Sequence, residues 1–299
     1  MMHQDWERYL QGADASAGSG AAGIAYLPEL AAVRFSGSDV RKFLQGYLTC
    51  DTDDLGAGRL TPTALCNLKG RVVMNGWCVP LPEDSEGAQA IALILHQSLV
   101  ERLQSFLEAY LKFSRSALTD LRDSVLVFGT LDAAGTDAAD EPDGALIMDP
   151  RRRLDLVSTL DQAITLWDGH SHIDAATWHA SLTADRIPLV STAVSETFLP
   201  QMLDLQALGA INFEKGCYLG QEVVARAQHR GQVKRRLARL GWRGSAHPVP
   251  GAEINDRAGR TQGVVVQTAT DGSGLLLAVL SRDAPGDLRQ GDVDLSLDP

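Results

Sequence analysis

Residues 213–236 read FEKGCYLGQEVVARAQHRGQVKRR. Two glycines flank Cys217, and glycine lets the backbone come close to a partner. From Leu219 onward, apolar residues recur every four positions, which predicts a helix that begins there. Cys217 is therefore predicted at or just before a helix N-terminus, where unpaired N–H groups and the helix dipole favour a thiolate. Lys215 adds positive charge two residues earlier, so Cys217 is a candidate reactive group.

The same residues also support a purely structural interpretation. A cysteine is often a small, buried core residue. Glu222 and Arg226 have the i, i+4 spacing of an ordinary ion pair on a helix surface. The residues alone leave the reactive and the structural interpretation open.

Basic residues concentrate in this part of the chain. From Lys215 to Arg243 there are eight Lys and Arg and one acid, Glu222, in a chain whose net charge is −11. A basic segment on an acidic protein suggests an anionic partner. A phosphate, a polyglutamate tail and a nucleic acid are the candidates.

Composition is typical of a globular protein with room for two domains. The 299 residues are 44% hydrophobic and 22% charged. The chain contains neither an apolar stretch long enough to span a membrane nor an N-terminal secretory signal, so we expect a cytoplasmic protein. The four cysteines include no Cys-x-x-Cys pair, and His170, His172 and His179 lack a carboxylate at ligand spacing, so no bound metal is expected.

Periodicity up to about residue 233 predicts an α+β fold, with antiparallel sheet under helices. Two predicted strands, 60–66 and 72–81, are joined by a hairpin turn in which Gly70 can take a positive φ. The other predicted strands are 31–35, 90–95, 124–128, 146–148 and 153–157, and the predicted helices are 6–10, 40–47, 97–111 and 173–184. The apolar side of the helix 97–111 consists of Leu99, Val100, Leu103, Phe106, Leu107 and Tyr110.

The pattern changes after Gly231. Ala238, Leu240 and Trp242 alternate with more exposed positions, as in a half-buried strand. Four or five short strands separated by Gly and Pro follow within about 60 residues, which predicts a small β-barrel. We place a domain boundary near Lys234, so the predicted domains are 1–233 and 234–299.

The motif Lys215-Gly216-Cys217-Tyr218-x-Gly220-Gln221-Glu222, followed by Val224-Ala225-Arg226, resembles the signature of the YgfZ family. These are folate-binding proteins that assist iron–sulfur cluster assembly and repair, and they form a branch of the superfamily of the glycine-cleavage T-protein, an aminomethyltransferase. Residues 198–206, which read FLPQMLDLQ, resemble the family's lead-in to this motif. The resemblance covers most of the chain and is weaker between about 129 and 171.

The resemblance implies a three-lobed ring with a central channel that holds tetrahydrofolate. It implies that Cys217 is the functional thiol, with Lys215 beside it. The residues that it implies for folate binding are Asn67, Lys69, Tyr218, Gln221, Glu222, Arg226 and Arg230. Its implied partners are a reduced folate and iron–sulfur assembly proteins or client enzymes, such as those of tRNA thiomethylation. We expect a monomer without a membrane or direct nucleic-acid contact.

The chain departs from the aminomethyltransferase pattern at its acidic positions. In that branch an Asp-Asp pair follows the hairpin, and the corresponding residues here are Met74 and Asn75. Neither side chain can act as a carboxylate base. The glutamate that holds the pterin corresponds to Ala184, and the usual glycine before Ile-Pro is Arg186.

These departures favour a folate-binding accessory protein over the alternative, a folate-dependent one-carbon transferase. A third hypothesis is RNA contact through the basic segment. It is disfavoured because aromatic residues, which stack on single-stranded bases, are not interleaved with the charges.

Overall fold

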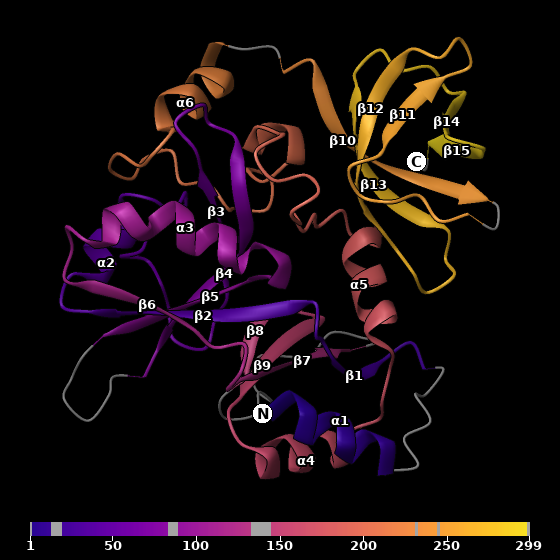
Figure 1. Ribbon diagram of the computed structural model, residues 1–299. Helices are drawn as coiled ribbons and strands as arrows, with labels where there is room; N and C mark the ends of the chain where they lie inside the picture. The colour runs from indigo at the N-terminus through magenta and orange to yellow at the C-terminus, as the bar shows by residue number, and fades with distance from the viewer. Residues whose placement is uncertain are drawn as a thin grey trace. The chain divides into compact units, whose positions relative to one another are not determined.

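The computed structural model describes residues 2–12, 20–82, 89–132, 145–230, 233–243 and 246–297. The chain forms two compact units (Figure 1). Unit 1 comprises residues 1–43, 53–61 and 77–178, and unit 2 comprises 44–52, 62–76 and 179–299. Both units are therefore built from segments that are separated in sequence. The boundary near Lys234 stays a prediction.

A four-stranded antiparallel sheet and two helices form one core of unit 1. The strand order is β1 (Gly23–Tyr26), β7 (Leu126–Leu131), β9 (Arg152–Val157) and β8 (Leu146–Asp149). Helices α1 (Met2–Gly12) and α4 (Leu160–Asp168) lie side by side (Figure 1). Trp6 of α1 is fully buried, and its ring packs edge-on against Phe128 and Trp167. The strand prediction is confirmed for β7, β8 and β9, whereas β1 and α4 were not predicted.

A five-stranded sheet has the order β3 (Thr61–Cys66), β4 (Val72–Leu81), β5 (Ala90–His96), β2 (Leu30–Gly37) and β6 (Ser116–Asp120). Helix α2 (Val40–Gln45) follows β2, and the turn η1 (Gln97–Leu99) with helix α3 (Val100–Leu111) follows β5. The apolar side of α3 buries Val100, Leu103 and Leu107. Tyr110 was predicted on that side, but it is 37% exposed because α3 ends one residue later and leaves its last turn uncovered.

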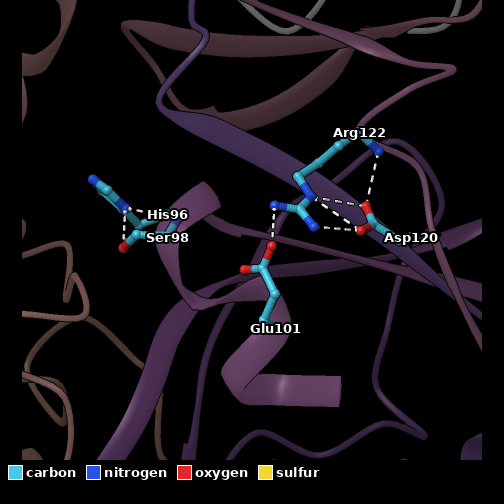
Figure 2. A network of polar contacts seen from close by, with 5 residues as sticks. All are labelled: His96, Ser98, Glu101, Asp120 and Arg122. Atoms are coloured by element: carbon cyan, nitrogen blue, oxygen red, sulfur yellow. Dashed lines mark hydrogen bonds and ion pairs between the residues drawn. The ribbon is translucent and has the colours of Figure 1, made fainter. Parts of the chain in front are cut away.

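Charged side chains connect α3 to β6 (Figure 2). Arg122 contacts Glu101 at 2.8 Å and donates to the Asp120 carboxylate at 2.7 Å. Burial alone would raise the pKa of Asp120, but hydrogen bonds from the Arg122 side chain and backbone lower it. Nearby, the His96 ring accepts from the Ser98 backbone N–H and lies 2.8 Å from the Ser98 hydroxyl. His96 therefore caps η1, and the network stabilises the edge of the sheet.

The predicted hairpin between β3 and β4 is confirmed. Gly70 has a φ of +67°, a conformation that glycine adopts at little cost. The side-chain oxygen of Asn67 accepts the backbone N–H groups of Lys69 and Arg71, at 2.9 and 3.0 Å. Asn67 therefore fixes the turn from inside.

The C-terminal part of unit 2 is a closed β-barrel of six strands. Their order is β10 (Arg235–Arg243), β13 (Leu275–Ser281), β12 (Thr261–Thr268), β11 (Glu253–Asp256), β14 (Leu288–Gln290) and β15 (Val293–Leu297). The barrel prediction is confirmed, with six strands where four or five were expected. Strand β14 has only three residues, too few to show alternation.

Between residues 185 and 234 of the sequence, unit 2 contains mostly irregular chain. Helix α5 (Ala175–Ala184) leads into it, and the turn η2 (Pro200–Leu203) and helix α6 (Gln221–Arg230) interrupt it. Among the helices that the structure describes, none is both long and apolar enough to cross a membrane. This irregular segment carries the motif that the sequence singles out.

Candidate functional site

Lys215 is a buried cation held by backbone carbonyls. Only 7% of the residue is exposed, and its ammonium donates to the carbonyl oxygens of Gln45, Leu48 and Cys50, at 2.9, 2.8 and 2.7 Å. The ammonium also lies 5.5 Å from the centre of the Tyr218 ring. An ammonium has three donors, and three carbonyls meet them here. Lys215 thus fixes the turn that carries Cys217 to residues 45–50.

Cys217 is exposed, whereas Cys50, Cys66 and Cys78 are buried, and all four are free thiols. The predicted helix start is wrong: α6 begins at Gln221, four residues after Cys217. The reason is Gly220, whose φ of +81° turns the chain out of the helical path. The helix dipole falls off within the first turn, so it no longer supports a thiolate at this position. What remains is an accessible thiol in a turn with a defined backbone.

The Cys217 turn and α6 lie against the β3–β4 hairpin. A Cβ added at Gly220 would lie 2.4 Å from the backbone oxygen of Asn67, and one at Gly70 would lie 2.9 Å from Cβ of Val223. Because neither glycine has a Cβ, Gly220 can lie against the backbone of the hairpin, and Gly70 can lie against α6. The side-chain nitrogen of Asn67 donates to Glu196 at 2.7 Å. Figure 1 shows the tip of the hairpin beside α6.

The residues implied for folate binding have different environments. Asn67 uses its side chain in the hairpin, and Lys69 is exposed at its tip. Glu222 and Arg226 form an exposed ion pair at 2.9 Å, as their spacing allowed. Gln221 is half-buried at the start of α6. The side chain of Arg230 lies outside the described part of the chain.

Tyr218 is the residue of this set whose geometry points to a ligand. It is 6% exposed, and its hydroxyl finds no hydrogen-bond partner among the described residues. Burial raises the pKa of this hydroxyl, and the nearby Cys66 raises it further, so the group stays a neutral donor. A buried hydroxyl without a partner destabilises the folded state. A ligand atom that accepts a hydrogen bond from it would remove this destabilisation.

Asn75 and Met74, which stand where the aminomethyltransferases have an acidic pair, cannot act as acids or bases. The side-chain nitrogen of Asn75 donates to the Pro188 carbonyl at 2.7 Å, and its oxygen accepts the Val190 N–H at 2.8 Å. Met74 is fully buried. Asn75 therefore holds β4 against the segment after α5. Neither side chain carries a carboxylate that could accept a proton.

The sequence analysis missed a group of polar residues beside η2. A cavity of about 520 Å³ is lined there by Gln201, Asp204, Gln206, Ala227, Gln228, Val233 and Arg282. Three of these residues lie in the FLPQMLDLQ segment, whose resemblance to the family lead-in was the available signal. Single Gln and Asp residues in an irregular segment show no periodicity, so no pattern could select them.

His170 and His172 have structural roles in unit 1. His172 stacks on Trp167 with 3.9 Å between ring centres, and His170 lies 2.8 Å from the Leu166 carbonyl. Within the ranges that the structure describes, no three His, Cys, Asp or Glu side chains come together as metal ligands.

Comparison with known proteins places these features in a family. No family model matches the chain. The tRNA-modifying protein YgfZ of Sodalis glossinidius is 32% identical over 286 residues, covering 87% of this chain and 85% of the relative. YgfZ of Yersinia pseudotuberculosis and of Yersinia enterocolitica have the same identity and coverage.

A solved structure shares the fold. The glycine cleavage system aminomethyltransferase T from Bartonella henselae superposes with a TM-score of 0.70 over 98% of this chain and 96% of its own, at 14% identity. The expected T-protein-like fold is thereby confirmed. The chain, with its Cys217 turn and its C-terminal barrel, belongs to the YgfZ family of tRNA-modifying proteins.

Proposed function

We propose that this protein is a cytoplasmic, folate-binding accessory protein of iron–sulfur cluster assembly or repair, with Cys217 as its functional thiol. The observation that carries the proposal is the contrast among the cysteines: Cys217 is exposed in a fixed turn, and the other three are buried. The name of its relatives supports a role related to tRNA modification. Cluster-dependent enzymes of tRNA thiomethylation would be the clients.

A thiol can act in cluster chemistry as a metal ligand or as a sulfur carrier, and both roles need exposure. Complementation of a strain that lacks the protein tests this role, with tRNA thiomethylation as the readout. The Cys217→Ser variant should fail to restore it at normal protein abundance. Gly216→Ala is the matched control in the same turn, because a Cβ there meets no atom within 4 Å. Full rescue by Cys217→Ser would refute Cys217 as the functional thiol.

The proposed ligand is a reduced folate. Support comes from the unpaired Tyr218 hydroxyl, from the fold shared with an aminomethyltransferase and from the basic segment. Tyr218 would donate to a polar atom of the folate, while Asn67 holds the hairpin beside it. The reduced folate would supply one-carbon chemistry when bound. Glu222 and Arg226 bind each other, so we assign them no folate contact.

Calorimetry with tetrahydrofolate and its triglutamate tests this ligand. The Tyr218→Phe variant should weaken binding up to about tenfold, since a hydrogen bond contributes roughly 0.5–1.5 kcal/mol. Lys112→Met is the control, at an exposed lysine just after α3 that pairs with Glu108. Absence of heat with both folates at high micromolar concentration would refute folate binding.

Aminomethyl transfer is not part of the proposal. Both polar atoms of the Asn75 side chain are hydrogen-bonded to backbone groups, and neither Met74 nor Asn75 carries a carboxylate. Formation of methylenetetrahydrofolate from an aminomethyl-lipoyl donor should not exceed the uncatalysed rate. Catalysis above that rate would instead establish the one-carbon transferase.

The proposed partners are iron–sulfur proteins and not RNA. Lys234, Arg235 and Arg236 are exposed next to one another at the start of the barrel. No aromatic residue interrupts them to stack on bases. A monomer that binds tRNA only through a client enzyme fits this surface.

A further inference from the structure

We propose that the outer side of α3 docks a second protein, one that is basic and receives Phe106, Tyr110 and Phe113 in an apolar groove. These three residues, here called the aromatic ridge, belong to unit 1, whereas Cys217 belongs to unit 2. The docking surface itself goes beyond the proposed function. Only the identity of the partner, a tRNA-binding client enzyme, rests on that function.

Helix α3 is apolar on two sides, although a surface helix usually has one apolar and one polar side. Its inner side packs apolar residues into the unit. On its outer side Phe113 is 94% exposed, Tyr110 is 37% exposed and Phe106 is half-buried. Single exposed apolar residues are ordinary, but a contiguous apolar patch marks an interaction site. Packing within the fold does not account for the aromatic ridge.

The aromatic ridge is continuous. The ring centres of Phe106 and Tyr110 are 6.3 Å apart. Helix α3 ends at Leu111, but the Phe113 N–H donates to the Tyr110 carbonyl at 3.1 Å and extends the turn. The three aromatic residues therefore occupy positions i, i+4 and i+7, which fall on one side of a helix. This spacing is typical of helices that insert apolar side chains into a groove of another protein.

Charged groups flank the aromatic ridge, and their charges are paired within unit 1. Glu108 contacts Lys112 at 3.0 Å, and Glu101 contacts Arg122 at 2.8 Å (Figure 2). The guanidinium of Arg102 lies 5.8 Å from the centre of the Phe106 ring, within the range of a cation–π contact. An interface usually has an apolar centre and a polar rim. The aromatic ridge can fill the centre while these pairs stay intact at the rim.

Net charge indicates which class of partner unit 1 attracts. Its segments contain 24 Asp and Glu and 12 Lys and Arg, a net charge of −12, whereas unit 2 contains 14 and 15. A negative field of this kind attracts a basic protein and lowers the affinity for polyanions such as RNA. It also disfavours the anionic surface of a membrane. The aromatic ridge therefore fits an apolar groove on a basic protein.

An enzyme that binds tRNA has the required charge, because it neutralises phosphates with Lys and Arg. The relatives of this chain are named tRNA-modifying proteins. A client enzyme of tRNA thiomethylation is thus a basic protein of the kind that the aromatic ridge fits. The ridge then supplies binding affinity that does not involve the Cys217 thiol.

Site-specific crosslinking in living cells tests the docking surface. The photoreactive residue p-benzoylphenylalanine replaces Tyr110 in one variant and Val249 in the control, because Val249 is an apolar residue of unit 2 that is 57% exposed. Irradiation at residue 110 should give an adduct with a basic protein, and the crosslinked peptide should come from an apolar groove of that protein. The control should not give this adduct.

Four results would overturn the docking surface. They are no adduct at residue 110, an adduct of the chain with itself, an adduct with RNA or lipid, and the same protein adduct at residues 110 and 249. An adduct with a basic protein that does not act on tRNA would support the surface and reject the client enzyme as its partner.

The Phe113→Ser variant tests whether the aromatic ridge contributes affinity. Combined with the crosslinker at residue 110, it should reduce the adduct at least fivefold, because a few aromatic residues often provide most of the affinity of an interface. Val249→Ser is the matched control and should leave the adduct unchanged. Both residues are exposed, so both variants should melt within about 2 °C of wild type. An adduct that Phe113→Ser does not reduce would overturn the ridge as the contact.

Two further measurements separate this proposal from the proposed function. Phe113→Ser should lower tRNA thiomethylation at least twofold in complementation, yet leave the rate of Cys217 alkylation unchanged. Unchanged thiomethylation with a reduced adduct would reject the client enzyme as the partner. A basic-protein adduct together with full rescue by Cys217→Ser would support the docking surface and refute the functional thiol. Failed rescue by Cys217→Ser, with full rescue by Phe113→Ser and no adduct, would do the reverse.

Discussion

Unit 2 contains two polar regions that differ in how their hydrogen bonds are satisfied. Around Lys215, three donors of a buried ammonium meet three backbone carbonyls. Around Asp204, two glutamine oxygens have no donor among the described residues, and the backbone takes a left-handed conformation. A buried polar group that is fully paired stabilises a fold, whereas an unpaired one destabilises it. The first region is therefore structural, and the second has the character of a binding site.

Removal of the Lys215 ammonium should have the largest effect on stability. Lys215→Met keeps the length of the side chain but removes the donor of three buried hydrogen bonds. We expect a loss of about 3 kcal/mol in the free energy of unfolding, measured by urea denaturation. Lys69→Met, at an exposed lysine, should change it by less than about 0.5 kcal/mol. Equal effects of the two substitutions would mean that the carbonyls find water and that Lys215 does not hold the turn.

A methyl group at Gly220 should have the next largest effect. Gly220→Ala forces alanine into a φ of +81° and places Cβ 2.4 Å from the Asn67 oxygen. We expect a cost of roughly 2 kcal/mol, the middle of the range for strained backbone. Gly216→Ala is the matched control, since its Cβ meets nothing within 4 Å. If both variants melt at the wild-type temperature, there is no close contact between Gly220 and the backbone of Asn67.

Asp204→Asn should change stability less, and in a pH-dependent way. The folded pKa of Asp204 is raised, so the folded state binds the proton more tightly than the unfolded state does. Wild-type stability therefore falls as pH rises from the unfolded pKa, about 3.9, through the raised folded pKa. Asparagine tolerates the left-handed φ and carries no charge.

The melting temperature of Asp204→Asn, relative to wild type, should thus increase across that pH window and level off above it. Thermal denaturation at several pH values measures this difference. A difference that stays constant with pH would show that the Asp204 carboxylate is as well solvated when folded as when unfolded.

The smallest effect on stability is expected at Cys217. Its side chain is exposed, so Cys217→Ser should change the free energy of unfolding by less than about 0.5 kcal/mol. A charged alkylating reagent should label Cys217 before the other three thiols, because access limits their reaction. Burial also raises the pKa of Cys66 to about 12, which leaves little thiolate near neutral pH. Mass spectrometry of the labelled peptides gives the order, and labelling of Cys66 first would contradict it.

The sequence predicted those elements that repeat a pattern over several residues. The β3–β4 hairpin and the barrel followed from alternation and turn glycines, and α3 from its apolar stripe. The helix start near Cys217 was wrong because the backbone angle at Gly220 interrupts a continuous apolar pattern. The short strand β14 has too few residues to show a pattern.

The environment of the candidate site could not be read from local sequence. The burial of Lys215 depends on carbonyls of residues 45–50, which lie far away in the chain. The cavity depends on residues of η2, α6 and the barrel, whose proximity is tertiary. Family resemblance predicted the fold correctly, but it gave no information on which polar atoms lack partners.

The bond between Lys215 and Cys50 joins residues 165 positions apart, and this separation has a consequence for biosynthesis. Translation at about 5–20 residues per second separates the two residues by roughly 8–33 s. During this time the carbonyls of residues 45–50 lack the cation that binds them in the finished protein. The turn that carries Cys217 therefore forms late, after most of the chain has been made. The thiol thus takes its final position only when unit 2 closes on its earliest segment.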